Sequence, residues 1–143
     1  MIRAAVDADV PRLVAMGSRF LEESHYGTMF KRNDIALAAL MRRLINSNDG
    51  VVFVSVDWPS LSGMIGGVVY DHPMTGERTA TEAFWWVDPE NRGHGLSLLR
   101  RFTAWAKAHG AVKLQMIAPD ERVSRVYCGL GFTKLEEHFQ KDI

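Results

Sequence analysis

The sequence predicts an α/β (α+β) fold in which a mixed β-sheet carries helices on both faces. Continuous β-branched runs such as VVFVSV at 51–56 are typical of strands that are buried on both sides. In other stretches, for example from Val10 to Leu21, apolar residues recur at helical spacing. The two kinds of segment alternate in the order β-α-α-β-β-β-α-β-α-β, so helices are expected to cover the sheet.

The expected elements follow one another with no interdomain linker, internal repeat or low-complexity segment, so one domain is expected over residues 1–143. A chain of this length can bury a core without disulfides. In chain order the expected elements are a strand at 2–6, a helix from about 10 to 23, a helix that starts at 33 or 34 and ends at NSNDG, strands at 51–56, 64–70 and 79–87, a helix at 96–109, a strand at 112–118, a helix from 120 to 131 and a last strand in the tail FTKLEEHFQKDI.

Capping and turn residues justify the boundaries in the first half. Asp7 is expected to be the N-cap of the first helix, and Asn33 or Asp34 that of the second, because short polar side chains accept hydrogen bonds from free helix amides. Gly66 and Gly67 interrupt a strand pattern, which indicates a bulge or a close neighbour. The turn-rich stretch DHPMTGER is expected to be the loop before the third long strand, TATEAFWWV.

The second half is bounded in the same way. Leu98 and Phe102 belong to an apolar helical stripe that ends at Gly110, a residue suited to the C′ position. Asp120 is expected to cap the following helix, and Gly131 to end it. The tail after Gly131 alternates loosely between apolar and polar residues, which predicts a final strand.

Composition excludes several classes of protein. Lys plus Arg equals Asp plus Glu, 17 against 17, so no overall charge favours nucleic acid or an anionic membrane. Cys128 is the only cysteine and the five histidines are scattered, so no disulfide framework and no metal site is expected. The N-terminus lacks the pattern of a secretory signal, and no run is apolar enough to span a membrane. A cytoplasmic protein is therefore expected.

A glycine-rich turn, RGHG, lies between the third long strand and the next helix. Gly93, His94 and Gly95 stand where unpaired helix amides and the helix dipole favour an anion, and Arg92 adds a charged donor. The stretch is neither GxGxxG nor GxxxxGK[ST], so neither a dinucleotide nor an ATP site is indicated. A turn that only changes the direction of the chain is an equally good interpretation of these four residues alone.

The surrounding residues resemble a known family. VDPENRGHGLSLL is similar to the acyl-CoA-binding signature [QR]-x-x-G-x-[GA] of the GNAT superfamily of N-acetyltransferases. Arg92 and Gly95 match its first two fixed positions, whereas Ser97 stands where Gly or Ala is usual. Serine is still small, so close approach of a pyrophosphate remains compatible with this position.

A second signature supports the resemblance. DERVSRVYCGLGF is similar to the family's N-x-x-A-x-x-x-Y-x-x-x-G-F segment. Tyr127, Gly131 and Phe132 match, while Asp120 replaces the usual Asn and Val123 the usual Ala. The order of elements from residue 2 onward also agrees with the family.

The resemblance implies a GNAT-like, mostly antiparallel central sheet that is splayed between the strands at 80–87 and 112–118. Acetyl-CoA would lie in the opening as co-substrate, with its pantetheine on the strand edge and its pyrophosphate on the amides of residues 93–97. No metal is implied. The residues that the resemblance assigns to acetyl-CoA are Trp86, Val87, Arg92, Gly93, His94, Gly95, Leu96, Ser97 and Asp120.

The implied reaction is direct transfer of an acetyl group to an amine, which needs a proton acceptor for the amine and a proton donor for the leaving thiolate. Tyr127 matches the family's general acid; its alternative role is a ring packed in the core. Cys128 has no activating neighbour in the sequence and is expected to be a small buried hydrophobe. His94 is expected to neighbour the diphosphate or solvent and not to act as the base.

Glu82 is the candidate base. It lies in the middle of an aromatic-rich strand, ten residues before Arg92, and family members that modify lysine side chains often carry a glutamate at the matching position. Apolar surroundings would raise the pKa of its carboxyl group. Two alternatives stay open: a glutamate on an exposed sheet face paired with Arg78 or Lys113, and an ordered water as base.

The acceptor is less clearly encoded. By the resemblance, the segment between the first two helices lies over the acceptor side, so Tyr26 and Phe30 are expected to bind substrate together with Tyr70 and His72. These residues could instead close the core. The acceptor amine belongs to a protein, a peptide or a small molecule, and a homodimer in which a partner chain completes the site is also open. The competing interpretation of the whole chain is a non-catalytic acyl-CoA-binding or protein-interaction module on the same fold.

Overall fold

The computed structural model describes residues 1–143 and contains one five-stranded sheet with the order β1-β2-β3-β4-β5. All neighbouring strands are antiparallel except β4 and β5, which are parallel. The elements are β1 (Ile2–Ala4), η1 (Asp7–Asp9), α1 (Val10–Glu23), α2 (Tyr26–Met29), α3 (Asp34–Ile45), β2 (Gly50–Asp57), β3 (Ser60–Asp71), β4 (Arg78–Val87), η2 (Pro89–His94), α4 (Gly95–Ala108), β5 (Lys113–Gln115) and α5 (Glu121–Gly129).

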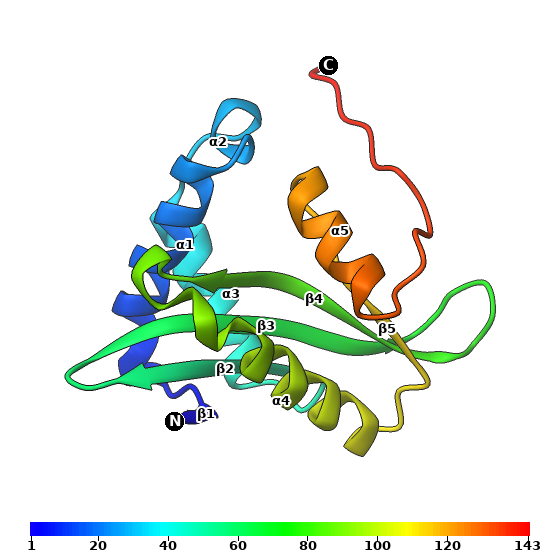
Figure 1. The fold of residues 1–143 in the computed structure, drawn as a ribbon, viewed down its shortest axis with the longest axis horizontal. Coiled ribbons are helices and arrows are strands. Elements are labelled where there is room, and N and C mark those ends of the chain that lie inside the picture. The colour runs from blue at the N-terminus through cyan, green and yellow to red at the C-terminus, as the bar shows by residue number, and fades with distance from the viewer.

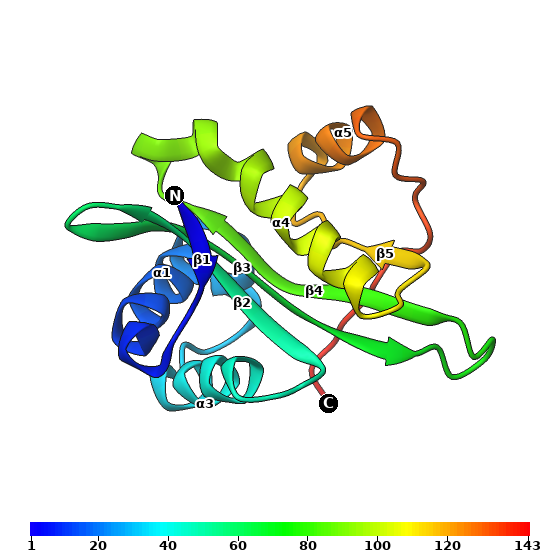
Figure 2. The same ribbon diagram turned by 90° about the horizontal axis from the view of Figure 1, so that it is seen from below.

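Helices cover both faces of the sheet, as predicted. Figure 2 shows α1 and α3 on one face and α4 on the other. On the first face, Leu13 and Met41 pack in one buried cluster with Phe84 and other strand residues. On the second face, Leu98 and Phe102 pack in a separate cluster with β2 and β3 side chains. Burial of these two apolar helix stripes is the main stabilising contribution to the layered fold.

The pair Gly66–Gly67 marks a bulge, also as predicted. The pairing of β3 with β4 shifts register between these glycines, and Ala83 of β4 is the extra residue. A Cβ on Gly66 would lie 2.4 Å from the Phe84 ring, and one on Gly67 would lie 2.7 Å from the Phe102 ring. Glycine is therefore required at both positions: at Gly66 because of the Phe84 ring, and at Gly67 because of the Thr81 carbonyl oxygen, 2.2 Å from that Cβ, as well as the Phe102 ring.

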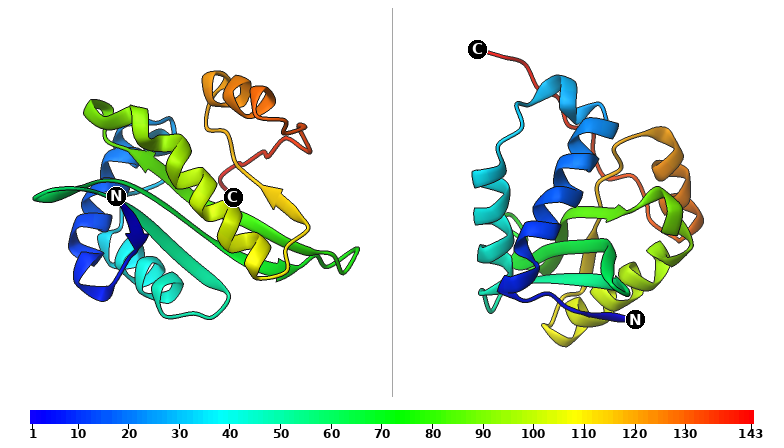
Figure 3. Two further views of the ribbon diagram at one scale, coloured as in Figure 1. Left: turned by 60° about the horizontal axis from the view of Figure 1, so that its bottom comes forward. Right: turned by 90° about the vertical axis from the view of Figure 1, so that its left-hand side faces the viewer.

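The splay between β4 and β5 gives the molecule its opening. The two strands pair only where Thr79–Thr81 faces Lys113–Gln115, after which β4 continues to Val87 without a neighbour on that side. Figure 3 shows the chain leaving β5 and rising to α5. The strand predicted at 112–118 is thus only three residues long, because its second half has no partner to pair with.

Two capping predictions are confirmed and one is wrong. Asn33 accepts from the Ala36 amide at 3.0 Å, and Asp120 accepts from the Val123 amide at 2.9 Å. Asp7 instead lies in η1, and Asp9 is the residue before α1. The carboxylate of Asp9 accepts from the amide of Val6 and from Arg3, which leads the chain into η1 before the helix begins.

The predicted last strand is absent. Gly131 has a φ of +91°, and the chain after Phe132 forms no backbone hydrogen bond with any strand. The tail runs toward α2, where the side chain of Gln140 donates to the carbonyl oxygen of Met29 at 3.4 Å. Loose alternation is not enough to make a strand when no sheet edge lies beside the segment. None of the helices combines the length and apolar character that a membrane crossing requires.

Candidate active site

A cleft of about 870 Å³ opens where β4 loses its neighbour. Figure 1 shows α2 and the end of α1 above the left part of β4, and α5 above its right part. Residues 82–87 of β4 line the cleft between these two sides, and Ile117 and Tyr127 line it on the α5 side. The edge of β4 that faces away from β3 carries no strand here. Its backbone is therefore available to an extended ligand.

The bulge decides which way Glu82 points. Side chains alternate along a strand, so an unbroken β4 would put Glu82 on the same face as Phe84 and Trp86, which pack with the α1–α3 cluster. Ala83 is the extra residue, and Glu82 instead shares the face of Ala80, which packs with α4. This shift brings the carboxylate to the splayed side of the sheet, where the chain after β5 passes.

The Glu82 carboxylate is buried and only half satisfied. Glu82 is 6% exposed, and its Oε1 accepts a hydrogen bond from the Ile117 amide at 3.0 Å. The other oxygen, Oε2, is buried with no partner. Burial raises the pKa of Glu82 to about 7, against the lowering effect of the Ile117 hydrogen bond. The alternative of an exposed glutamate paired with Arg78 is therefore wrong; Arg78 pairs with Asp49 and Asp71.

Tyr127 is also buried and lines the same cleft. Its ring stacks on that of Trp85 with 6.0 Å between centroids, and its hydroxyl donates to the carbonyl oxygen of Ile117 at 3.3 Å. Burial raises the pKa of Tyr127, and the charge of Glu82 raises it further. Ile117 thus holds both groups, since its amide binds the carboxylate and its carbonyl binds the hydroxyl.

The glycine turn has two differently placed glycines. A Cβ on Gly93 would meet nothing within 4 Å, and the residue has no positive φ, so the protein's own packing does not require glycine there. Gly95 begins α4 beneath Trp85, and its amide donates to the carbonyl of Arg92. Arg92 lines the cleft with its guanidinium carbon 6.0 Å from the centroid of the Trp86 ring.

The other residues assigned to acetyl-CoA divide into two groups. Val87, Leu96 and Asp120 line the cleft with Trp86, although the carboxylate of Asp120 is engaged as the cap of α5. Gly93, His94 and Ser97 do not line it. Ser97 is an exposed residue in the first turn of α4, so its departure from the family pattern falls outside the cleft wall.

The structure brings together two of the four residues predicted for the acceptor. Tyr26 and Phe30 line the cleft, on the side opposite Tyr127. Tyr70 and His72 do not line it; the hydroxyl of Tyr70 donates to Gln115 at 3.0 Å. Tyr70 lies near the end of β3 and His72 just after it, beside the part of β4 that is still paired with β5 and therefore away from the splay.

Several cleft residues carried no recognisable sequence signal. Ser24 and Trp85 each have a buried polar side-chain atom without a partner, as Glu82 does. Phe20 was expected only as a helix core residue, yet it lines the cleft. Orphaned buried polar atoms are rare, and three of the four in this protein belong to cleft residues. Cys128, expected to be buried, is exposed and lies outside the cleft.

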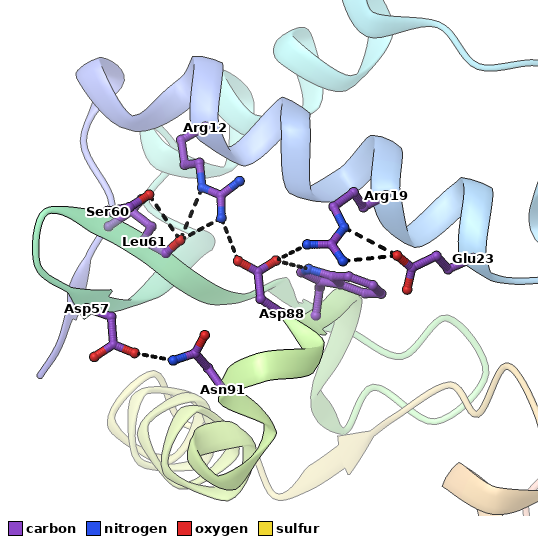
Figure 4. Close-up of polar contacts among 9 residues, drawn as sticks. Arg12, Arg19, Glu23, Asp57, Ser60, Leu61, Asp88 and Asn91 are labelled. Carbon is purple, nitrogen blue, oxygen red and sulfur yellow. Dashed lines mark hydrogen bonds and ion pairs between the residues drawn. The ribbon is translucent and has the colours of Figure 1, made fainter.

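Asp88 ties the end of β4 to α1. It is buried, and its carboxylate accepts from Arg12 at 2.6 Å, from Arg19 at 3.3 Å and from the indole of Trp86 at 3.0 Å (Figure 4). Asn91 adds a link from η2 to Asp57 at 2.7 Å. These contacts fix α1 relative to the strand and the turn that follow it, and they therefore fix the width of the cleft at this end.

Comparison with known proteins agrees with this geometry. Residues 18–132 match the model of the "Acetyltransferase (GNAT) family". The chain belongs to this family. A search of curated proteins found no match. In this GNAT chain, no three His, Cys, Asp or Glu side chains gather in a way that could hold a metal ion.

Solved structures of other proteins share the GNAT fold at low sequence identity. A mutant of the BH1408 protein from Bacillus halodurans has a TM-score of 0.85 and 20% identity over 100% of this chain and 99% of its own. A predicted acetyltransferase from Clostridium acetobutylicum, solved with acetyl-CoA, has a TM-score of 0.80 and 21% identity over 99% of this chain and 95% of its own. An aminoglycoside 6'-N-acetyltransferase from Acinetobacter haemolyticus has a TM-score of 0.76 and 16% identity over 100% of this chain and 99% of its own.

Proposed function

We propose that this protein is an acetyl-CoA-dependent N-acetyltransferase that moves an acetyl group directly to a primary amine. The observation that carries the proposal is the buried Glu82 carboxylate, whose Oε2 has no partner and which lines one cleft with Tyr127. Membership of the GNAT family and the similarity to a protein solved with acetyl-CoA support the choice of co-substrate.

Acetyl-CoA fits the residues present. The unpaired edge of β4 at Trp86 and Val87 offers backbone groups to an amide-containing chain, and Arg92 offers a cation to a phosphate. Gly93 leaves open space where a side chain would stand, and nothing in the protein fills it. A glycine kept without a packing reason is consistent with close approach of a ligand to the backbone.

Glu82 serves as proton acceptor. The attacking amine must be neutral, and a carboxylate whose pKa is about 7 can take up a proton near neutral pH. The amine nitrogen then adds to the acetyl carbonyl carbon, and the carbon–sulfur bond breaks when the tetrahedral oxyanion collapses and expels the CoA thiolate. Tyr127 keeps its proton because burial raises its pKa, and it can supply that proton to the leaving thiolate. The alternative function is acyl-CoA binding without catalysis.

The proposal is tested by binding and turnover together. Calorimetry with acetyl-CoA should detect binding, and thiol release with a panel of primary amines should detect transfer. In Tyr127→Phe, which keeps the ring stacked on Trp85, we expect kcat to fall about 100-fold with little change in KM for acetyl-CoA. Turnover of Tyr127→Phe at the wild-type rate would refute the role of the hydroxyl. Binding without turnover of any amine would favour the non-catalytic module.

A further inference from the structure

The α1–α2 side of the cleft is a continuous aromatic surface. Phe20 contacts the Trp86 ring edge-on, with centroids 6.2 Å apart, and lies 5.5 Å from Tyr26. The ring of Phe30 stacks on the ring of Tyr26, with 6.0 Å between their centroids. We call Phe20, Tyr26 and Phe30 the aromatic wall; all three line the cleft, and Phe30 is 50% exposed. An exposed aromatic surface of this kind is suited to an apolar ligand.

Carboxylates near the aromatic wall already have partners. Glu23 pairs with Arg19 at 3.1 Å, and Glu22 pairs with Arg32 at 3.0 Å. Asp120, on the other side of the cleft, caps α5. These acids therefore do not form a cluster that would attract a polycation.

Glu82 is the exception, since it is the one buried carboxylate in the cleft with a free oxygen. It offers a site for one ammonium group. Arg122 also lines the cleft and would repel a second cationic group on a ligand, whereas the charge of Arg92 is assigned above to a phosphate of acetyl-CoA. The charges of the cleft thus suit one amine and disfavour several.

We propose that the acceptor is a primary amine with a single cationic group, borne on an aromatic or aliphatic body that packs against the aromatic wall. The amine lies at Glu82 and the apolar body extends toward Tyr26 and Phe30. The buried hydroxyl of Ser24, which has no partner in the protein, gives such a ligand one further polar contact. This inference rests on the proposed function, because it names the substrate class of the same site.

Gly27 sets the position of the wall. A Cβ at this residue would lie 2.4 Å from the carbonyl oxygen of Leu21, so α2 packs against the end of α1 only because residue 27 is glycine. Gly27→Ala therefore displaces the wall without removing an aromatic ring. Gly129, where a Cβ would meet nothing within 4 Å, offers a matched control in another helix.

The test compares kcat/KM for amines of different charge by thiol release at saturating acetyl-CoA. We expect 2-phenylethylamine and hexylamine to exceed spermidine and kanamycin by at least about 10-fold, a ratio of the size that one apolar contact provides. Tyr26→Ala and Gly27→Ala should each raise KM for 2-phenylethylamine about 10-fold and change kcat much less. Gly129→Ala and Phe139→Ala, the latter at an 87% exposed tail residue, should leave the KM for 2-phenylethylamine unchanged.

The outcomes separate this inference from the proposed function. If spermidine or kanamycin is the better substrate, the protein is an acetyltransferase and the inference is wrong. If no amine is turned over, the proposed function fails, and binding of the same amines to CoA-saturated protein is measured by calorimetry. Tighter binding of 2-phenylethylamine than of spermidine then supports the inference, whereas equal or weaker binding overturns it.

Discussion

The two walls of the cleft differ in how firmly their side chains are held. Glu82 and Tyr127, on the β4–α5 side, are each 6% exposed and are both bound to the backbone of Ile117. On the α1–α2 side, Tyr26 begins a four-residue helix with no buried residue, and Phe30 is the residue that follows this helix. The catalysis proposed above would thus use side chains fixed by backbone hydrogen bonds, and the proposed ligand recognition would use a short segment between two helices.

The network around Asp88 joins the two walls. Arg12 and Arg19 project from α1, whereas Asp88 directly follows β4 (Figure 4). The indole of Trp86, from the end of β4, donates to the same carboxylate. We call Glu82 and Tyr127 the sheet wall. A change in the sheet wall should therefore affect the rate of reaction, and a change in the network around Asp88 should affect the stability of the protein.

The largest effect is expected from Glu82→Gln. Glutamine keeps the acceptor for the Ile117 amide but cannot take a proton, so we expect kcat to fall about 100- to 1,000-fold at pH 8. Stopped assays of thiol release measure this loss, and calorimetry should find acetyl-CoA binding unchanged. Unaltered kcat would mean that water is the base and that the sheet wall holds only one catalytic group.

The same variant changes the response to pH. Because the pKa of Glu82 is raised from 4.5 to about 7, wild-type kcat/KM should rise with pH through about 7, and Glu82→Gln should lack this step. Stability has the opposite trend: the folded state holds the proton more tightly, so the free energy of unfolding decreases as pH rises from 4.5 to about 7. Above pH 7, Glu82→Gln should be more stable than wild type by on the order of 2–3 kcal/mol, as measured by urea denaturation.

A smaller effect is expected from Asp88→Asn. Loss of this buried charge leaves Arg12 and Arg19 without their shared partner, and we expect about 1–3 kcal/mol of lost stability, reduced from the fully buried case because both arginines are about a third exposed. Urea denaturation measures the change. Glu22→Gln, which breaks an exposed pair with Arg32, is the control and should cost less than about 0.5 kcal/mol. Equal effects would show that Asp88 does not hold the walls together.

Gly93→Val tests the glycine turn, whose neighbouring residues Arg92 and Gly95 line the cleft. The new side chain meets nothing in the protein, so the melting temperature should stay the same, whereas Kd for acetyl-CoA should rise about 10-fold through obstruction of the ligand. The control Gly129→Val adds the same side chain in similarly open surroundings away from the cleft. A Kd that is unchanged in Gly93→Val would remove the turn from the acetyl-CoA site.

Cys128→Ser should have the smallest effect. The thiol is exposed and does not line the cleft, so direct transfer predicts a change in kcat of less than about 2-fold. Mass spectrometry of protein incubated with acetyl-CoA alone should find no acetyl group on this residue. If Cys128 is acetylated and then passes its acetyl group to an amine, the transfer is not direct but has two steps. The reacting residue would then be Cys128, which lies outside the cleft.

Local patterns in the sequence determined much of this protein. They predicted the order of the strands β1 to β5 and of the longer helices α1, α3, α4 and α5, but not the short helix α2. They also predicted the caps Asn33 and Asp120 and the bulge at Gly66–Gly67. They also singled out Glu82 and Tyr127, because a charged residue in an apolar strand and a tyrosine within a spaced motif are visible without any tertiary contact. Periodicity and capping depend on neighbours within a few residues, and this is why they can be predicted from the sequence.

Only the tertiary structure decided how these pieces meet. Ala83 turns Glu82 toward the splayed side, and the loss of pairing after Gln115 leaves the strand edge free. Tyr70 and His72 fall outside the cleft, while Phe20 and Ser24 enter it. The tail forms no strand because no sheet edge lies beside it. Burial, unpaired edges and orphaned polar atoms depend on residues far apart in the chain, which no local pattern specifies.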